Sequence, residues 1–185
     1  MASKIDLVSA ALVIVGDKPI NTLVGNSRAQ QVANALYDNV VQNELSKHRW
    51  GFARTKAQLS LTTDTPVDDE WRSIYQLPSD LITLIKIKPN VPYQILGDKV
   101  YCNLSQKLTC DYIYNAPESE WPVYFSKMVE YALALDFARS IRDSGGAQAD
   151  IAAQYTNASR MARFTDSQQH PQTPIVNRPF VNVRF

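Results

Sequence analysis

The first third of the chain decides the fold class: residues 3–52 read SKIDLVSAALVIVGDKPINTLVGNSRAQQVANALYDNVVQNELSKHRWGF. Its opening part predicts a helix over about 3–15, because apolar residues recur there at spacings of three and four. Ser3 with Asp6 matches the capping box that begins a helix, and Gly16 can take the left-handed conformation that ends one. The apolar face of this helix consists of Ile5, Val8, Leu12 and Val15.

A second, amphipathic helix is predicted over about 27–48. Ser27 and Gln30 form another capping box at its start. The segment that ends it, residues 48–50 (His-Arg-Trp), is typical of a helix C-terminus, where positive charge suits the helix dipole and an indole packs inward. The buried stripe of this helix is predicted to consist of Ala29, Val32, Ala33, Leu36, Val40 and Leu45.

The middle of the chain changes to a period of two, which is typical of strands. Residues 81–88 are apolar and β-branched, and residues 91–103 carry Gly97-Asp98 at their centre, a pair typical of a hairpin turn. Alternation returns over 108–114. We therefore predict four to six short strands between about residues 56 and 115.

Two further helices are predicted over about 122–143 and 147–164, separated by a Gly-Gly pair. Pro122 suits the first turn of the earlier one. That helix is apolar over much of its circumference, so we expect it to be central. The predicted fold class is α+β: mainly an antiparallel helical bundle with an inserted small antiparallel β region, in a single domain over 1–164.

The last stretch, residues 165–185, has no periodic pattern and carries three prolines. We predict an extended C-terminal arm. Its apolar tip would rather be buried than solvated, so we expect the arm to dock on a partner. The residues predicted to make that contact are Pro179, Phe180, Val181, Val183, Arg184 and Phe185.

Composition excludes several classes of protein. The 185 residues are 45% apolar and carry a net charge of +1, so no global field draws the chain to nucleic acid or to an anionic membrane. No apolar run approaches the length of about 20 residues that spans a bilayer. We expect no membrane partner.

An acidic cluster stands out in the middle of the chain. It lacks the spacing and the central glycine of a calcium loop, which favours a solvated loop. In a ring-shaped assembly the same loop would face the channel and repel DNA phosphates. The cluster consists of Asp64, Asp68, Asp69 and Glu70.

The two cysteines, Cys102 and Cys110, are not spaced as a CxxC pair, and no nearby histidine completes a zinc site. We predict two free thiols that face each other across a hairpin. A disulfide and a metal site are the alternatives.

Catalytic patterns are missing from the sequence: it has no nucleophile paired with a base and no phosphate-binding glycine loop. The local carboxylate pairs are Glu118 with Glu120 and Asp69 with Glu70. Neighbouring residues in loops rarely reach the separation that glycoside hydrolysis needs. We therefore expect no enzyme, no cofactor and no metal site.

One family shares the layout of the first third. Residues 11–20 (ALVIVGDKPI), then Leu23 and Gly25, then the long helix, then residues 47–53 (KHRWGFA), resemble the tail tubular protein A family. These proteins are head-to-tail adaptors, or connectors, of tailed bacteriophages. The later order of a β-rich segment followed by two helices is also similar to that family.

The resemblance implies a structural role in the virion, at its neck or tail, after assembly in the host cytoplasm. Such proteins form a ring, typically of twelve subunits, beneath the portal protein. They join it to a downstream tail or nozzle protein, and double-stranded DNA passes through them without sequence-specific binding. Their C-terminal extension grips the portal, although the sequence leaves open whether residues 165–185 reach the portal or a neighbouring subunit.

Two other interpretations stay open from the sequence. One is a small tail-associated hydrolase that acts on cell-wall glycan. The other is a soluble α+β domain of unrelated role.

Overall fold

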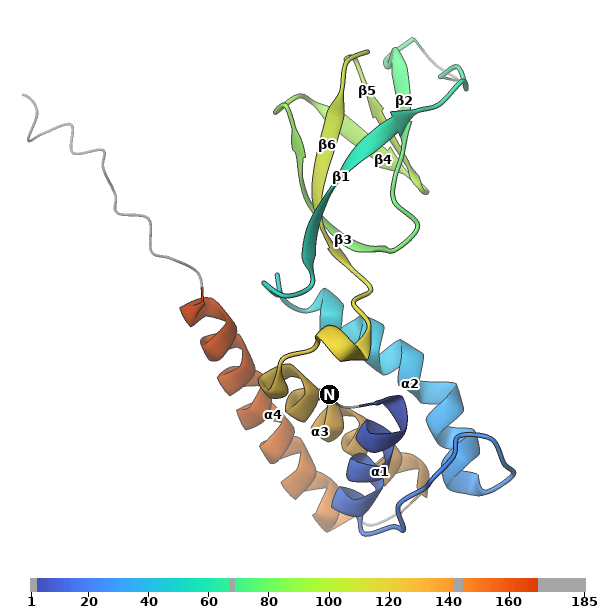
Figure 1. Ribbon diagram of the computed structural model, residues 1–185, viewed down its shortest axis with the longest axis vertical. Helices are drawn as coiled ribbons and strands as arrows, with labels where there is room; N and C mark the ends of the chain where they lie inside the picture. The colour runs from blue at the N-terminus through green and yellow to red at the C-terminus, as the bar shows by residue number, and fades with distance from the viewer. Residues whose placement is uncertain (1–2, 67–68, 142–144, 170–185) are drawn as a thin grey trace, which may run out of the picture.

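The computed structural model describes residues 3–66, 69–141 and 145–169. Four helices form one lobe, and a sheet forms a second lobe at one end of it (Figure 1). In chain order the elements are α1 Lys4–Val15, α2 Arg28–Ser46, β1 Arg54–Leu61, β2 Ser73–Gln76, β3 Leu81–Lys88, β4 Tyr93–Leu96, β5 Lys99–Cys102, β6 Leu108–Tyr114, the 3-10 turn η1 Glu118–Glu120, α3 Val123–Ile141 and α4 Gly145–Gln168.

The ends of the first two helices follow the predicted local chemistry. The hydroxyl of Ser3 accepts from the backbone of Asp6, whose side chain accepts from Ser3 in return, and Ser27 with Gln30 repeats this capping box on α2. Gly16 ends α1 in the left-handed region, at φ 85° and ψ 24°. A residue with a Cβ is disfavoured there, so glycine is what makes the sharp exit possible.

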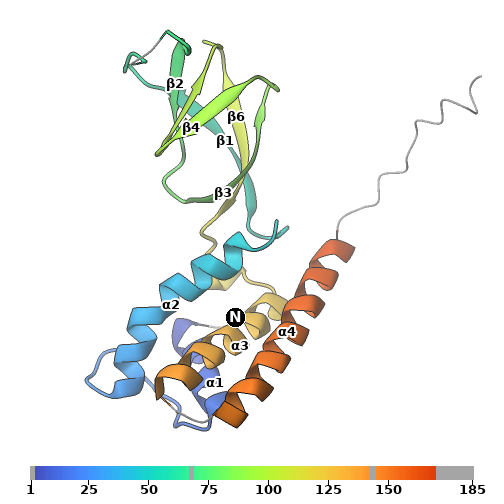
Figure 2. The same ribbon diagram turned by 180° about the vertical axis from the view of Figure 1, so that it is seen from behind.

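The helical lobe is organised around α3, as its apolar circumference predicted. α3 packs against α1, α2 and α4, and the view from behind shows α4 lying along it (Figure 2). The core of this lobe includes the fully buried Leu7, Leu12, Leu45, Met128, Leu133 and Phe137.

The six strands form one antiparallel sheet in the order β3-β6-β1-β2-β5-β4. Four residues, 89–92, connect its two edges, β3 and β4. They reach about 18 Å at most, whereas the edges of a flat sheet of six strands lie about 24 Å apart. The sheet must therefore curl, and Figure 1 shows it as a half-barrel.

The sheet has its own apolar interior, separate from the helical core. The half-barrel encloses Leu59, Tyr75, Leu77, Ile87, Val100, Cys102, Leu108, Cys110 and Tyr112. The prediction of a mainly helical bundle with a small β insert is therefore wrong: 46% of the described residues are helical, 22% are in strands, and the strands build a half-barrel. The strand positions were visible in the sequence, but their joining into one curved sheet with a core was not.

An aromatic cluster joins the two lobes. Trp50 lies just before β1, where the chain leaves the helices, and Trp121 just after η1, where it returns. Both indoles meet the ring of Phe125 on α3 edge-on, with ring centroids 5.0 Å apart in each case, and Phe52 lies 4.8 Å from the same ring. Phe125 thus holds both crossing points of the chain against the helical core.

The predicted arm begins later than expected. α4 continues through Gln168, so residues 165–168 are helical and belong to the folded lobe. Residues 170–185, which include every predicted contact residue of the arm tip, lie outside the described part of the chain.

We predict that Phe125→Ala lowers the free energy of unfolding by about 3–5 kcal/mol, because it removes a fully buried ring that both crossing points of the chain pack against. The matched control is Val123→Ala two residues earlier, whose side chain is 85% exposed. It should change stability by less than about 0.5 kcal/mol. Urea unfolding followed by far-UV circular dichroism measures both, and equal effects of the two variants would contradict this role of Phe125.

Candidate assembly surfaces and the cleft between the lobes

The outer edge strand of the sheet, β4, exposes apolar side chains. Tyr93 is 39% exposed, Ile95 42% and Leu96 49%, and Gln94 is the remaining residue. β4 pairs with β5 on one side only; within residues 3–169 as described, no strand lies along its other side. The backbone N–H and C=O groups that point away from β5 are therefore open to pairing.

The register shows which way these side chains point. Tyr93 lies directly opposite Cys102, and Ile95 directly opposite Val100. Cys102 and Val100 are fully buried in the interior of the half-barrel, and residues directly opposite each other share a face of the sheet. Tyr93 and Ile95 therefore continue the interior layer, and they are exposed because that layer ends at an open side.

The outer face of β4 is different. Gln94 accepts a hydrogen bond from the indole N–H of Trp71 (3.0 Å), which brings Trp71 against the outside of the sheet. At the β4–β5 turn, Gly97 sits at φ 63°, with open space around the position that a Cβ would take. The exposed apolar surface is therefore the inner face of β4, along its unpaired edge.

The other edge, β3, is protected. It carries the exposed Lys86 and Lys88, and its pairing with β6 contains two register shifts. Charged lysines and bulges are the common ways in which proteins prevent an edge strand from pairing with another chain. β4 has neither a charge nor a register shift in its pairing with β5. The two edges of one sheet are thus opposite in character.

A second exposed apolar surface lies on the helical lobe. Met161 is 55% exposed and Phe164 is 60% exposed on α4, and three residues apart on a helix they are neighbours. Arg160 and Arg163 flank them and are exposed. This surface combines apolar and cationic groups, unlike β4.

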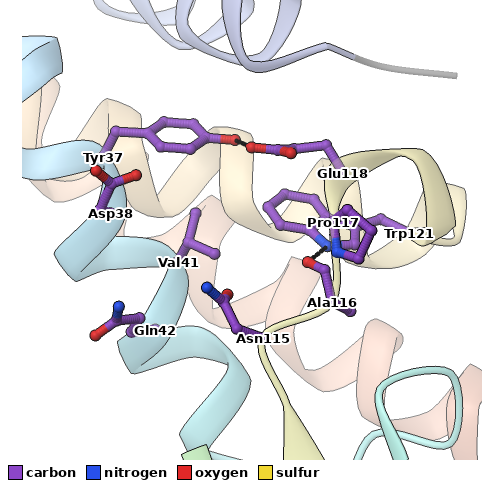
Figure 3. Close-up of a pocket in the computed structure, with 9 residues that line it drawn as sticks. All are labelled: Tyr37, Asp38, Val41, Gln42, Asn115, Ala116, Pro117, Glu118 and Trp121. Atoms are coloured by element: carbon purple, nitrogen blue, oxygen red, sulfur yellow. Dashed lines mark hydrogen bonds between the residues drawn. The ribbon is translucent and has the colours of Figure 1, made fainter. Parts of the chain in front are cut away.

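A polar cleft of about 450 Å³ lies between α2 and the segment that leads from β6 to α3 (Figure 3). Tyr37, Asp38 and Gln42 line it from α2, and Asn115 and Glu118 line it from the other side. A second cleft of about 600 Å³ shares Gln42 and Asn115 and adds polar groups from both lobes: Asn39, Asn43, Ser46, Ser79 and Asp80. Amide and hydroxyl groups of this kind can bind polar ligands or the backbone of a peptide.

The carboxylates of η1 act as ties between elements. The Tyr37 hydroxyl donates to Oε1 of Glu118 at 2.9 Å, and the Tyr114 hydroxyl donates to Glu120. The hydrogen bond to Glu120 raises the pKa of Tyr114 to about 12, and burial followed by the bond to Glu118 raises the pKa of Tyr37 as well. Both tyrosines therefore stay neutral hydrogen-bond donors at physiological pH. The two carboxylates predicted as a pair make separate structural contacts, Glu118 with Tyr37 and Glu120 with Tyr114.

A buried carboxylate that the sequence analysis missed fixes the end of α4. Asp166 is 1% exposed; it accepts from the backbone N–H of Gly51 (3.1 and 3.2 Å) and from the Tyr124 hydroxyl (2.9 Å). Nε2 of His48 lies 3.5 Å from its Oδ2. Asp166 thereby ties α4 to the α2–β1 connection and to α3. The sequence could have indicated that Asp166 is buried, because it lies four residues after Ala162 and therefore on the same buried stripe of α4.

The predicted acidic loop is only partly described. The Asp64 carboxylate pairs with Lys99 at 2.5 Å on the β4–β5 hairpin, and Asp69 and Glu70 are exposed. Asp68 lies outside the described residues. The loop therefore lies close to the β4–β5 hairpin, and whether it faces a channel stays a prediction.

The cysteines are free and buried, but they do not lie opposite each other across a hairpin. Cys102 pairs with Ser73 and Tyr93, and Cys110 pairs with Ala57 and Ile87. They stand on β5 and β6, which are separated in the sheet by β1 and β2. The expectation of a pair across a hairpin is wrong, because their strands are not neighbours. Burial raises the pKa of the Cys110 thiol.

The residues after α2 pack as predicted. Trp50 is fully buried, and its indole N–H donates to the carbonyl of Glu44 at 2.9 Å. Among the described residues there is no group of three or more His, Cys, Asp or Glu side chains placed to hold a metal ion. A helix long and apolar enough to cross a bilayer is likewise missing from the described part.

Comparison with known proteins identifies no relative: the sequence matches no protein-family model and no curated protein.

We predict that Asp166→Ala lowers the free energy of unfolding by about 2–4 kcal/mol, because it leaves the half-buried Gly51 N–H and Tyr124 hydroxyl without their acceptor. Asp150→Ala, an exposed aspartate of the same helix, is the matched control and should change stability by less than about 0.5 kcal/mol. Urea unfolding measures both. An unchanged midpoint for Asp166→Ala would show that α4 is held without this contact.

Proposed function

We propose that the chain is a structural assembly protein, a head-to-tail adaptor of a tailed bacteriophage. It forms a ring beneath the portal, joins the capsid to the tail and continues the channel through which DNA leaves. The proposal begins from the resemblance of residues 11–53 to the tail tubular protein A family. The observation that supports it further is the unprotected edge of β4, which exposes the inner layer of the sheet and leaves backbone groups open to pairing with another chain.

A ring requires two different surfaces on each subunit. Contacts of the head-to-tail kind join unlike patches, and they close into a ring when the rotation between subunits permits it. The apolar edge on β4 and the mixed apolar and cationic surface around Met161 and Phe164 are unlike each other and lie on different lobes. In the proposed assembly these two surfaces are available to neighbouring copies, to the portal and to a downstream tail or nozzle protein. The resemblance suggests twelve subunits.

The charge of the chain suits a conduit. A net charge of +1 gives little overall attraction for the phosphate backbone, whereas a strongly basic channel would hold DNA by counterion release. In the proposed ring the acidic residues Asp64, Asp68, Asp69 and Glu70 face the channel and repel passing DNA. No sequence-specific DNA contact is proposed.

The alternative of a cell-wall hydrolase gains no support from the candidate carboxylates. Glu118 and Glu120 accept hydrogen bonds from two different tyrosines, one on α2 and one on β6. A retaining or inverting glycosidase needs two carboxyl groups that flank one bond of the substrate. We therefore propose that both residues are structural contacts, of which Glu118 lines the cleft.

We predict that the purified protein is a monomer or small oligomer alone, and that it forms a ring-sized complex when mixed with portal rings of the same virus. Light scattering after gel filtration measures both masses. Portal rings of an unrelated phage are the control and should bind no more than trace amounts. If the well-folded protein binds neither to itself nor to its own portal, the adaptor proposal is wrong.

A further inference from the structure

The open side of the half-barrel calls for one more strand, and the chain carries a segment that fits it. We infer that residues 180–185 of a neighbouring copy pair with the free edge of β4 as a seventh strand. The inference rests on the proposed ring and names the contact between its subunits. The resemblance alone would send this segment to the portal, whereas β4 supplies an acceptor for it within the assembly.

The acceptor sets three requirements on its occupant. The occupant must be extended, because the free groups on β4 are those of a strand edge. It must present apolar side chains at every second position, in order to continue the layer that ends at Tyr93 and Ile95. It needs only a few residues, because β4 itself has four.

The end of the chain meets these requirements in its sequence. Residues 180–185 read FVNVRF, in which Val181, Val183 and Phe185 alternate with Asn182 and Arg184. Valine and phenylalanine are among the residues that favour strands. As a strand, the segment would place Val181, Val183 and Phe185 towards Tyr93 and Ile95 and leave Phe180, Asn182 and Arg184 on the other side.

Length and charge support the same occupant. Sixteen residues follow Gln169, and extended chain of that length spans about 50 Å. Residues 170–185 carry Arg178 and Arg184 and have no acidic residue. On the acceptor, the exposed Asp69 lies two residues before Trp71, whose indole N–H donates to Gln94 of β4. The two charges are complementary.

A neighbouring copy, rather than the same chain, is the donor that builds an assembly. Donor segment and acceptor edge are different surfaces, so the contact is of the head-to-tail kind that closes into rings. The same pairing within one chain would fill the open edge and leave it unavailable to any other subunit.

Disulfide trapping in the full-length protein tests the pairing. Ile95→Cys is mixed, in separate reactions, with Val181→Cys, Val183→Cys and Phe185→Cys, both in concentrated solution and on portal rings. Because directly opposite strand residues lie within disulfide range, at least one mixture should give a linked dimer on a non-reducing gel. Asn182→Cys is the matched donor control, and Leu96→Cys, on the other face of β4, is the matched acceptor control. The unmodified chain, with Cys102 and Cys110 buried, controls for the native thiols.

We expect the linked fraction to be several times higher for the inward donor positions than for Asn182→Cys. The double variant Ile95→Cys with Val183→Cys should give a ladder of linked oligomers. A linked monomer would show pairing within one chain, and equal linking at Asn182→Cys would show random collision. Either result, or no link under both conditions, would overturn the inference.

A second pair of variants tests the contact without cysteines. Ile95→Asp should abolish the ring-sized complex that forms on portal rings, since it puts a charge on the inner face where the added strand packs, whereas Leu96→Asp should leave that complex intact. Circular dichroism checks that both variants fold. Equal effects of the two substitutions would overturn the inference. If linked ladders form but the protein does not bind portal rings, the strand pairing stands and the adaptor proposal fails.

Discussion

The structure depends on one aromatic contact, the packing of Trp50 and Trp121 on either side of Phe125. The chain leaves the helical lobe at the first of these residues and returns at the second, with the whole sheet between them. Because both indoles pack against one ring on α3, the two crossings are held together at the base of the sheet. Tyr114, which packs against both the helical core and the interior of the half-barrel, continues this junction into the sheet. The aromatic contact therefore fixes both points at which the sheet joins the helices.

The two edges of the half-barrel differ in how well they are protected from pairing with another chain, and this difference connects the fold with the proposed function. Lys86, Lys88 and two register shifts protect the β3 edge, while the β4 edge is neutral, regular and apolar. A free edge of that kind is a liability for a protein that acts alone, because it invites pairing with other chains. In a subunit of a larger assembly the same edge is a binding site. The polar cleft between the lobes and the surface at Met161 and Phe164 supply further places for contact.

Local chemistry was predictable from the sequence, and long-range arrangement was not. Both capping boxes, the left-handed Gly16 and the hairpin turn at Gly97 depend on a few adjacent residues, and the structure confirms them. The fold class was wrong because the order of strands in the sheet depends on pairings between distant segments. The cysteine prediction failed for the same reason. Asp166 was assigned to the arm because a polar residue near the end of an alanine-rich helix resembles a surface residue until its partners from two other elements are known.

Hydrogen–deuterium exchange at residues 93–96, compared between the free protein and the protein assembled with portal rings, shows directly whether the β4 edge is a subunit contact. We expect the backbone amides on the free side of β4 to exchange rapidly in the free protein and to become protected in the assembly, while those of β3 change little. Amides on β4 that exchange equally fast in both states would contradict this expectation, because an edge that stays open in the assembly is not where the subunits meet.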